Sequence, residues 1–265
     1  MALVFSFFTS VKYCPAFFCL NNTLSFSNMV FAIPCLLYAG TVPVTMDQCI
    51  EHCRAVRRGA PNTFIVGDMP FLSYQVSVEE AVRNAGRFYK EADVDAVKLE
   101  GGVRVCQQIR AIADAGMLII GHIGLTPQSS GQLGGFKAQG RTAEAALGVI
   151  KDARAVQQAG AFALLVEAVP PEVSKIIRDD LMIPVYGIGA GVHVDGQLTI
   201  CSDLLGLFQA FTPKFIKKYE NLAERSIKAF SEYAQEVRNS QFPEEQHTYK
   251  MVDGEYEKLL EGLKG

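Results

Sequence analysis

Short apolar runs of four or five residues alternate with longer amphipathic stretches over most of the chain beyond Gly40. The runs lack the alternation of polar and apolar positions that marks a half-exposed sheet, so we interpret them as strands buried on both faces. Strands alternating with helical stretches predict a parallel sheet covered by helices. The predicted strands are residues 63–67, 96–99, 117–121, 162–166 and 185–188, with a short candidate at 204–208.

The stretches between these strands carry signals for helix starts. Thr45 and Ser77 are each followed three positions later by Gln or Glu, the capping-box pattern. Pro170 and Pro171 suit the first turn of a helix, where proline is tolerated. The predicted helices are 45–58, 77–92, one through Val105, Ile109 and Ile112, 143–158, one from Pro170, and 214–238.

Two α/β architectures fit this pattern. A (β/α)8 barrel takes about 250 residues, and its first two strands would then lie within residues 1–40, where no such unit is apparent. A doubly wound open sheet is the alternative, but the glycine run at 187–191 misses the Gly-x-Gly-x-x-Gly spacing of dinucleotide-binding turns. That run is compatible with a tight turn or with a direct substrate contact.

The first 40 residues differ in composition from the rest. Lys12 is the only charged side chain before Asp47. No basic region or Ala-x-Ala site marks a secretory signal, and no arginine marks a mitochondrial presequence. We interpret residues 1–40 as a divergent apolar segment, with a membrane-surface anchor as the alternative. The predicted organisation is this segment, a barrel domain over 41–250 and a charged tail over 251–265.

Composition narrows the function classes. The chain has 265 residues, of which 49% are hydrophobic, enough for one sizeable core. A net charge of −3 without a basic run gives no footprint for nucleic acid. The seven cysteines form no Cys-x-x-Cys motif, so we expect reduced, buried thiols, a cytoplasmic location and no membrane partner.

Five chemically active side chains stand at the ends of four successive predicted strands. On a strand, Lys98 and Glu100 point to the same side because they are two apart. The carboxyl ends of barrel strands form one face, which holds the active site. Asp68 and Glu100 suit a hard divalent cation, and Glu167 suits a general base. The five residues are Asp68, Lys98, Glu100, His122 and Glu167.

Each residue also has a structural alternative. Asp68 could cap a turn, Lys98 and Glu100 could form an ion pair, His122 could be a hydrogen-bonded strand-end residue, and Glu167 could pair with a neighbour. The glycine-rich loop over 123–141 suits a lid or a pocket wall rather than a plain surface loop, because it follows His122 directly.

Three segments carry a family resemblance. Val-Lys-Leu-Glu-Gly-Gly at 97–102, Gly-His-Ile-Gly-Leu-Thr-Pro-Gln at 121–128 and Gly-Gly-Phe-Lys-Ala-Gln-Gly at 134–140 resemble the ketopantoate hydroxymethyltransferases. The resemblance implies a (β/α)8 barrel of the phosphoenolpyruvate/pyruvate superfamily, Mg²⁺, and large homo-oligomers, often decamers. It also implies transfer of a hydroxymethyl group from 5,10-methylenetetrahydrofolate to 3-methyl-2-oxobutanoate, giving 2-dehydropantoate for pantothenate biosynthesis.

Site roles follow from the same resemblance by motif match. Asp68 and Glu100 would bind the metal, Asp68, Lys98 and His122 would contact the oxo acid, and Glu167 would be the catalytic base. One departure concerns the family's Gly-Asp-Ser segment, whose Asp binds the metal and whose Ser holds the substrate carboxylate. No Gly-Asp-Ser occurs in this chain. An inactive or oligomer-modifying relative is therefore one alternative, and a lyase or mutase of another 2-oxo acid is a further one.

Overall fold

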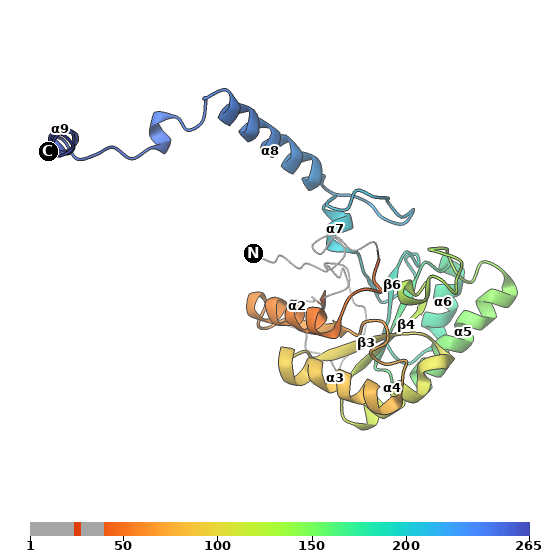
Figure 1. The fold of residues 1–265 in the computed structure, drawn as a ribbon. Helices are drawn as coiled ribbons and strands as arrows, with labels where there is room; N and C mark the ends of the chain where they lie inside the picture. The colour runs from red at the N-terminus through yellow and green to blue at the C-terminus, as the bar shows by residue number, and fades with distance from the viewer. Residues whose placement is uncertain (1–23, 28–39) are drawn as a thin grey trace. The chain divides into compact units, whose positions relative to one another are not determined.

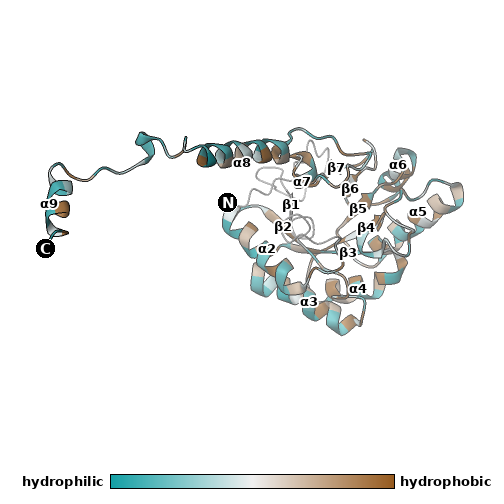
Figure 2. Ribbon diagram, turned by 45° about the horizontal axis from the view of Figure 1, so that its top comes forward, coloured by the Kyte–Doolittle hydropathy of each residue, from teal (hydrophilic) through white to brown (hydrophobic). Residues whose placement is uncertain are grey.

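The computed structural model describes the backbone of residues 24–27 and the whole of residues 40–265, in two compact units divided after Glu220. The first unit holds a parallel sheet in the order β1 to β7, and helices of that unit lie around it (Figure 1). Figure 2 shows these strands curling around a common axis, with helices on the outside. The strands are β1 (Leu24–Ser27), β2 (Phe64–Asp68), β3 (Ala96–Glu100), β4 (Ile119–Gly124), β5 (Ala163–Glu167), β6 (Val185–Ile188) and β7 (Gly196–Gln197).

Helices connect the strands of the first unit and make up most of the second. The second unit contains α8 (Leu222–Arg238), the 3-10 turn η3 (Glu245–His247) and α9 (Glu255–Gly262). The helices of the first unit are α2 (Met46–Gly59), α3 (Val78–Ala92), α4 (Cys106–Asp114), α5 (Ala143–Gln158), α6 (Pro171–Asp180) and α7 (Cys201–Leu204), with 3-10 turns η1 (Val103–Val105) and η2 (Pro127–Ser129).

The predicted α/β barrel type is confirmed by this curled parallel sheet with its outer helices. The capping box at Thr45 is present, since its side chain accepts from Gln48 N and the Gln48 side chain accepts from Thr45 N. The apolar N-terminal segment contributes β1, which pairs with β2 from Leu24 beside Phe64 to Ser27 beside Gly67. The rest of the predicted divergent segment lies outside the described residues.

Alternate strand residues divide the core into two layers. The larger layer lies between the strands and the helices and includes Ile65 and Ile119 from strands and Phe88 from α3. The inner face of the curled sheet carries a smaller cluster of Val66, Ala96, Ile120, Ala163, Leu165, Tyr186 and Ile188. Because side-chain direction alternates along a strand, residues two further along from Val66 and Ile120 also face inward. The inner cluster therefore forms the floor beneath the strand ends.

Two element predictions near the end of the first unit are wrong. The predicted strand at 204–208 is the end of α7 and a turn, because Gly206 (φ +64°) terminates the helix in the left-handed conformation that glycine favours. The predicted helix at 214–238 begins only at Leu222. Phe215 packs on the inner cluster and Tyr219 N donates to Leu204 O, so tertiary contacts replace the first helical turns.

Two further properties were predicted from composition. The thiols of Cys49 and Cys53 are buried as expected, whereas those of Cys106 and Cys201 are partly exposed. Within residues 24–27 and 40–265, no helix is both long enough and apolar enough to cross a membrane.

Candidate active site

The structure brings all five predicted site residues together on the inner face of the sheet, at the carboxyl ends of β2 to β5. Strand register places Asp68 beside Lys98 and Glu100 beside His122. Glu167 ends β5, the next strand. Asp68, Lys98, His122 and Glu167 each lie two residues further along their strand than a residue of the inner cluster, and Glu100 lies four residues further. All five therefore face inward, above an apolar floor, and form the charged rim of the site.

Lys98 is the centre of this cluster. Its Nζ lies 2.9 Å from Asp68 Oδ2, 3.5 Å from Glu100 Oε1 and 3.3 Å from His122 Nδ1. An ammonium has three protons to donate, and three acceptors surround it. Burial alone would lower the pKa of Lys98, but the carboxylates of Asp68 and Glu100 outweigh it and raise that pKa. Lys98 is therefore a permanent cation in the site.

His122 is held as a neutral ring. Burial, together with the charge of Lys98, lowers the pKa of His122 to about 3. Because an ammonium only donates, its contact with Nδ1 requires the tautomer that carries the proton on Nε2. Nε2 lies 3.1 Å from Glu167 Oε2, but the contact is not a hydrogen bond, and this buried atom has no such partner among the described residues. The site thus presents one unused N–H donor.

The three carboxyl groups share a raised affinity for protons. Burial raises the pKa of Asp68 and of Glu100, against the opposing charge of Lys98. Burial also raises the pKa of Glu167 to about 7, again against Lys98. A carboxyl group that titrates near neutrality is suited to accept a proton in one step and release it in another. The buried Oδ1 of Asp68 has no hydrogen-bond partner in the part of the chain that the structure describes.

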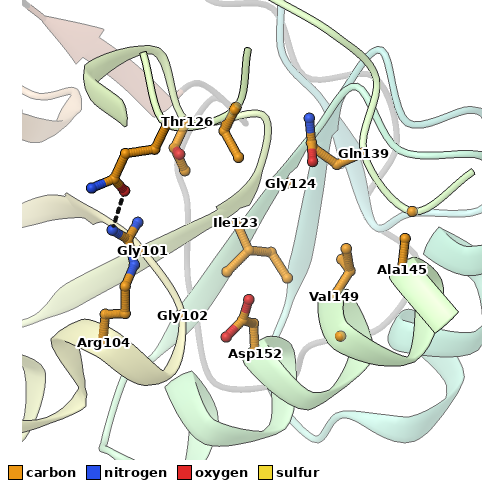
Figure 3. A pocket seen from close by; sticks show the side chains of 14 residues that line it. Gly101, Gly102, Arg104, Ile123, Gly124, Thr126, Gln139, Ala145, Val149 and Asp152 are labelled. Atoms are coloured by element: carbon orange, nitrogen blue, oxygen red, sulfur yellow. Dashed lines mark hydrogen bonds between the residues drawn. The ribbon is translucent and has the colours of Figure 1, made fainter. Parts of the chain in front are cut away.

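The glycine-rich loop after β4 lies beside this cluster and lines a cavity. Both of its ends attach at the end of β5, through Leu125 N to O of Glu167, the last residue of β5, and Gln139 N to O of Ala168, the residue after it, each at 2.9 Å. The cavity has a volume of about 480 Å³ and is bounded by this loop, the start of the β3–α4 connection and the first turns of α5 (Figure 3). Arg104 crosses from that connection to Gln132 in the loop, at 2.8 Å. The loop thus forms one wall of a cavity that none of the five site residues lines, and its role as a lid or substrate-pocket wall stays a prediction.

Sequence reasoning missed three buried polar residues at the site. Tyr74 and Gln128 form hydrogen bonds to Glu100, and neither stands at a strand end. Burial raises the pKa of the Asp203 carboxyl in α7, which Lys218 lowers and the nearby Glu167 raises further. Gln128 ends the Gly-His-Ile-Gly-Leu-Thr-Pro-Gln segment at 121–128, but the sequence does not show that it contacts Glu100. Tyr74 lies in a loop and Asp203 in the four-residue helix α7, and neither a loop nor so short a helix gives a periodic signal.

The metal assignment to Asp68 and Glu100 remains a prediction. Across residues 24–27 and 40–265, no group of three or more His, Cys, Asp and Glu side chains is arranged to hold a metal ion. Mg²⁺ commonly uses one or two protein carboxylates and keeps water and substrate as its other ligands. A site with two carboxylates is within this range.

A barrel-like sheet whose strand ends hold buried acids, an ammonium and an imidazole is the arrangement of α/β-barrel enzymes. Solved structures share the fold. One of 2,3-dimethylmalate lyase, a member of the PEP mutase/isocitrate lyase superfamily, has a TM-score of 0.50 at 15% identity, covering 91% of this chain and 81% of that one. One of phosphonopyruvate hydrolase has a TM-score of 0.51 at 15% identity, covering 90% and 82%.

Sequence comparison is more specific. The family model of ketopantoate hydroxymethyltransferase matches residues 30–245. The 3-methyl-2-oxobutanoate hydroxymethyltransferase of Alkaliphilus metalliredigens is 66% identical over 229 residues, which are 86% of this chain and 81% of that protein. The enzyme of the same name from Enterococcus faecalis is 50% identical over 225 residues, 85% and 82% of the two chains. The chain belongs to the ketopantoate hydroxymethyltransferase family.

Proposed function

We propose that this chain is a 3-methyl-2-oxobutanoate hydroxymethyltransferase, which transfers a hydroxymethyl group from 5,10-methylenetetrahydrofolate to 3-methyl-2-oxobutanoate and forms 2-dehydropantoate. The observation that carries the proposal is the placement of Glu167, with a pKa of about 7, beside the unused N–H of His122. The reaction needs a base that removes the C3 proton and a donor that stabilises the oxygen that gains charge.

The residues present fit Mg²⁺ on two grounds. The site gathers more carboxyl groups than cationic groups, since Asp68 and Glu100 share the one ammonium of Lys98, and a divalent cation would balance the excess negative charge when they are ionised. Among the described residues, the buried Asp68 Oδ1 also has no hydrogen-bond partner, and a metal ligand needs such a lone pair. Asp68 and Glu100 would hold the ion. Bound there, it would act as a Lewis acid on the 2-oxo group of the substrate.

The remaining side chains have separate tasks in this proposal. Glu167 accepts the C3 proton of the oxo acid. His122 donates from Nε2 to an oxygen of the oxo acid and remains neutral throughout, since its pKa is about 3. The three protons of the Lys98 ammonium already face three acceptors. A hydrogen bond from Lys98 to the substrate would therefore replace one of these three contacts. Asp68 contributes to the same subsite beside Lys98.

Assembly into a homo-oligomer is part of the proposal. Apolar side chains of α8 are exposed in the second unit, namely Ile227, Phe230, Tyr233 and Val237. Within α8 no residue is buried, and exposed apolar stripes of this kind mark protein interfaces. A family-like decamer would bury such a stripe. The buried thiols of Cys49 and Cys53 support the predicted cytoplasmic location, a reducing compartment.

Two measurements test the activity. The full chain with Mg²⁺ and both substrates is expected to release 2-dehydropantoate, and with Mg²⁺ and oxo acid alone in D₂O it is expected to exchange the C3 proton. Glu167→Gln is expected to stop the exchange and leave oxo acid binding largely intact, because it removes basicity and keeps shape. Absence of both reactions would favour the inactive relative, and turnover of another 2-oxo acid would favour a lyase or mutase.

A further inference from the structure

Glu100 is the most enclosed carboxylate of the site, with 1% of its side chain exposed. Its Oε1 faces the Lys98 ammonium at 3.5 Å, and its Oε2 accepts from Gln128 N at 2.9 Å. The backbone N–H that fixes Oε2 belongs to the loop after β4, while Glu100 itself ends β3. The position of this carboxylate therefore depends on what holds residue 128 in place.

The Gln128 side chain supplies that support. Its Nε2 donates to Met69 O at 2.8 Å, and its Oε1 accepts from Tyr74 OH at 2.8 Å. Met69 directly follows Asp68, so Gln128 ties the end of β2 to the loop that holds Glu100. The amide cannot turn over without losing both bonds, because Met69 O only accepts and the hydroxyl proton needs an acceptor.

Tyr74 closes the connection. Its hydroxyl accepts from Glu100 N at 3.1 Å and has one proton to donate. Gln128 Oε1 at 2.8 Å and Glu100 O at 3.2 Å compete for that proton, and the shorter distance favours Gln128. Burial is the main cause that raises the pKa of Tyr74, so the hydroxyl remains a donor at neutral pH. Tyr74, Gln128 and Glu100 are all buried.

We infer that Tyr74 and Gln128 are positioning residues that hold the Glu100 carboxylate at a fixed place relative to Asp68, so that the two carboxylates can bind one divalent cation. The inference rests on the proposed function for its choice of cation. Tyr74 and Gln128 are not proposed to contact the substrate. They act through Glu100, as hydrogen-bonding partners of metal ligands do in general, where their loss costs roughly 10- to 100-fold in metal affinity or activity.

Tyr89 offers a matched control. Its hydroxyl also joins two strands, accepting from Leu118 N at 2.7 Å and donating to Asp95 O at 2.9 Å. These contacts lie at the opposite, amino ends of β3 and β4. Tyr89→Phe therefore removes the same chemical group, which here bonds only to backbone atoms, away from the carboxylates.

The test measures binding of Mn²⁺, a spectroscopic substitute for Mg²⁺, to the full chain by electron paramagnetic resonance. Tyr74→Phe and Gln128→Met are expected to weaken Mn²⁺ binding roughly 10- to 100-fold, and Tyr89→Phe is expected to leave it unchanged. Circular dichroism and thermal unfolding show whether each variant is folded at the measuring temperature. A folded Tyr74→Phe or Gln128→Met variant with wild-type affinity overturns the inference.

Two further outcomes separate this inference from the proposed function. A wild-type chain that binds Mn²⁺ but forms no product refutes the transferase activity, while the comparison of Tyr74→Phe with Tyr89→Phe still decides the positioning role. A wild-type chain that binds no Mn²⁺ overturns the inference. If the activity is present, the Mg²⁺ concentration for half-maximal rate should rise in Tyr74→Phe by the same factor as the loss of Mn²⁺ affinity.

Discussion

Lys98 and Asp68 sit opposite each other on neighbouring parallel strands, with Lys98 Nζ 2.9 Å from Asp68 Oδ2. Both side chains are nearly enclosed, and the ammonium also lies 3.5 Å from Glu100 Oε1. A charge in this setting is costly to bury unless it is paired, so each member depends on the other. The ion pair between Lys98 and Asp68 is part of the candidate site and also stabilises the surrounding fold.

Replacing Lys98 by Met is expected to lower the free energy of unfolding by about 3–5 kcal/mol, because it leaves buried carboxylates without their cation. The loss should be larger at pH 8 than at pH 5, since the carboxyl groups already have raised pKa values and can escape by taking up protons at low pH. Urea unfolding at the two pH values measures both effects.

Arg154→Met is the control for that experiment. Arg154 pairs with Asp180 on the surface, and exposed ion pairs add little to stability. Its unfolding midpoint should stay close to that of the wild type at both pH values. If Lys98→Met also unfolds at the wild-type midpoint, the ion pair between Lys98 and Asp68 does not contribute the predicted stability.

The C3 proton exchange of 3-methyl-2-oxobutanoate should become faster as pH rises through 7. Glu167 acts as a base only when ionised, and with a pKa of about 7 its ionised fraction grows from about a tenth at pH 6 to about nine tenths at pH 8. NMR exchange rates at saturating Mg²⁺ should therefore rise roughly tenfold over this range. A rate that is level or falls with pH argues against Glu167 as the base.

Gly121→Ala is expected to destabilise the barrel by about 1–3 kcal/mol. A Cβ at Gly121 in β4 would lie 2.2 Å from Val156 Cγ1 in α5, so the helix or the strand must move. Gly86→Ala in α3 is the opposite case, because its added Cβ meets no atom within 4 Å. That variant should gain about 0.5–1 kcal/mol from reduced backbone freedom. Thermal or urea unfolding measures the stability change in each variant, and equal changes in the two variants would refute the prediction.

Replacing residues 1–40 by a family-like segment that contains Gly-Asp-Ser is expected to tighten Mg²⁺ binding and raise activity. Residues 1–40 contain no Asp or Glu, so they offer no carboxylate to the ion. A gain of tenfold in affinity corresponds to about 1.4 kcal/mol, and we expect at least that. Calorimetric titration with Mg²⁺ measures it. Equal affinity and equal turnover in the two chains would show that this segment does not limit the site.

Sequence alone predicted the strands β2 to β6 and the clustering of five polar strand-end residues, because both leave a local signal. Each buried strand reads as an apolar run, and a charged residue such as Lys98 or Glu167 at its end interrupts the run visibly. Tyr74 gave no such signal, since its value lies in contacts with Glu100 and Gln128 that are distant along the chain.

The wrong predictions also have tertiary causes. Residues 214–220 have a helical pattern, but Phe215 is held by the inner cluster, so the backbone leaves the helix. The strand β1 is defined by its pairing with β2 rather than by its own residues, since Ser25 and Ser27 interrupt the apolar pattern. In both cases an energy gained from a partner elsewhere in the chain outweighs local preference.

The loop between Leu125 and Gln139 is hydrogen-bonded at both ends to consecutive carbonyls, those of Glu167 at the end of β5 and of Ala168 directly after it. Because its two attachment points are fixed side by side, added residues lengthen only the free arc, at a small cost in closure entropy. The position of Glu167 therefore does not depend on the length of the loop that lines the cavity. Insertions and deletions beyond Gln128, whose contacts hold Glu100, can accumulate, and the cavity can change its shape, while the chemistry at Glu167 stays as it is.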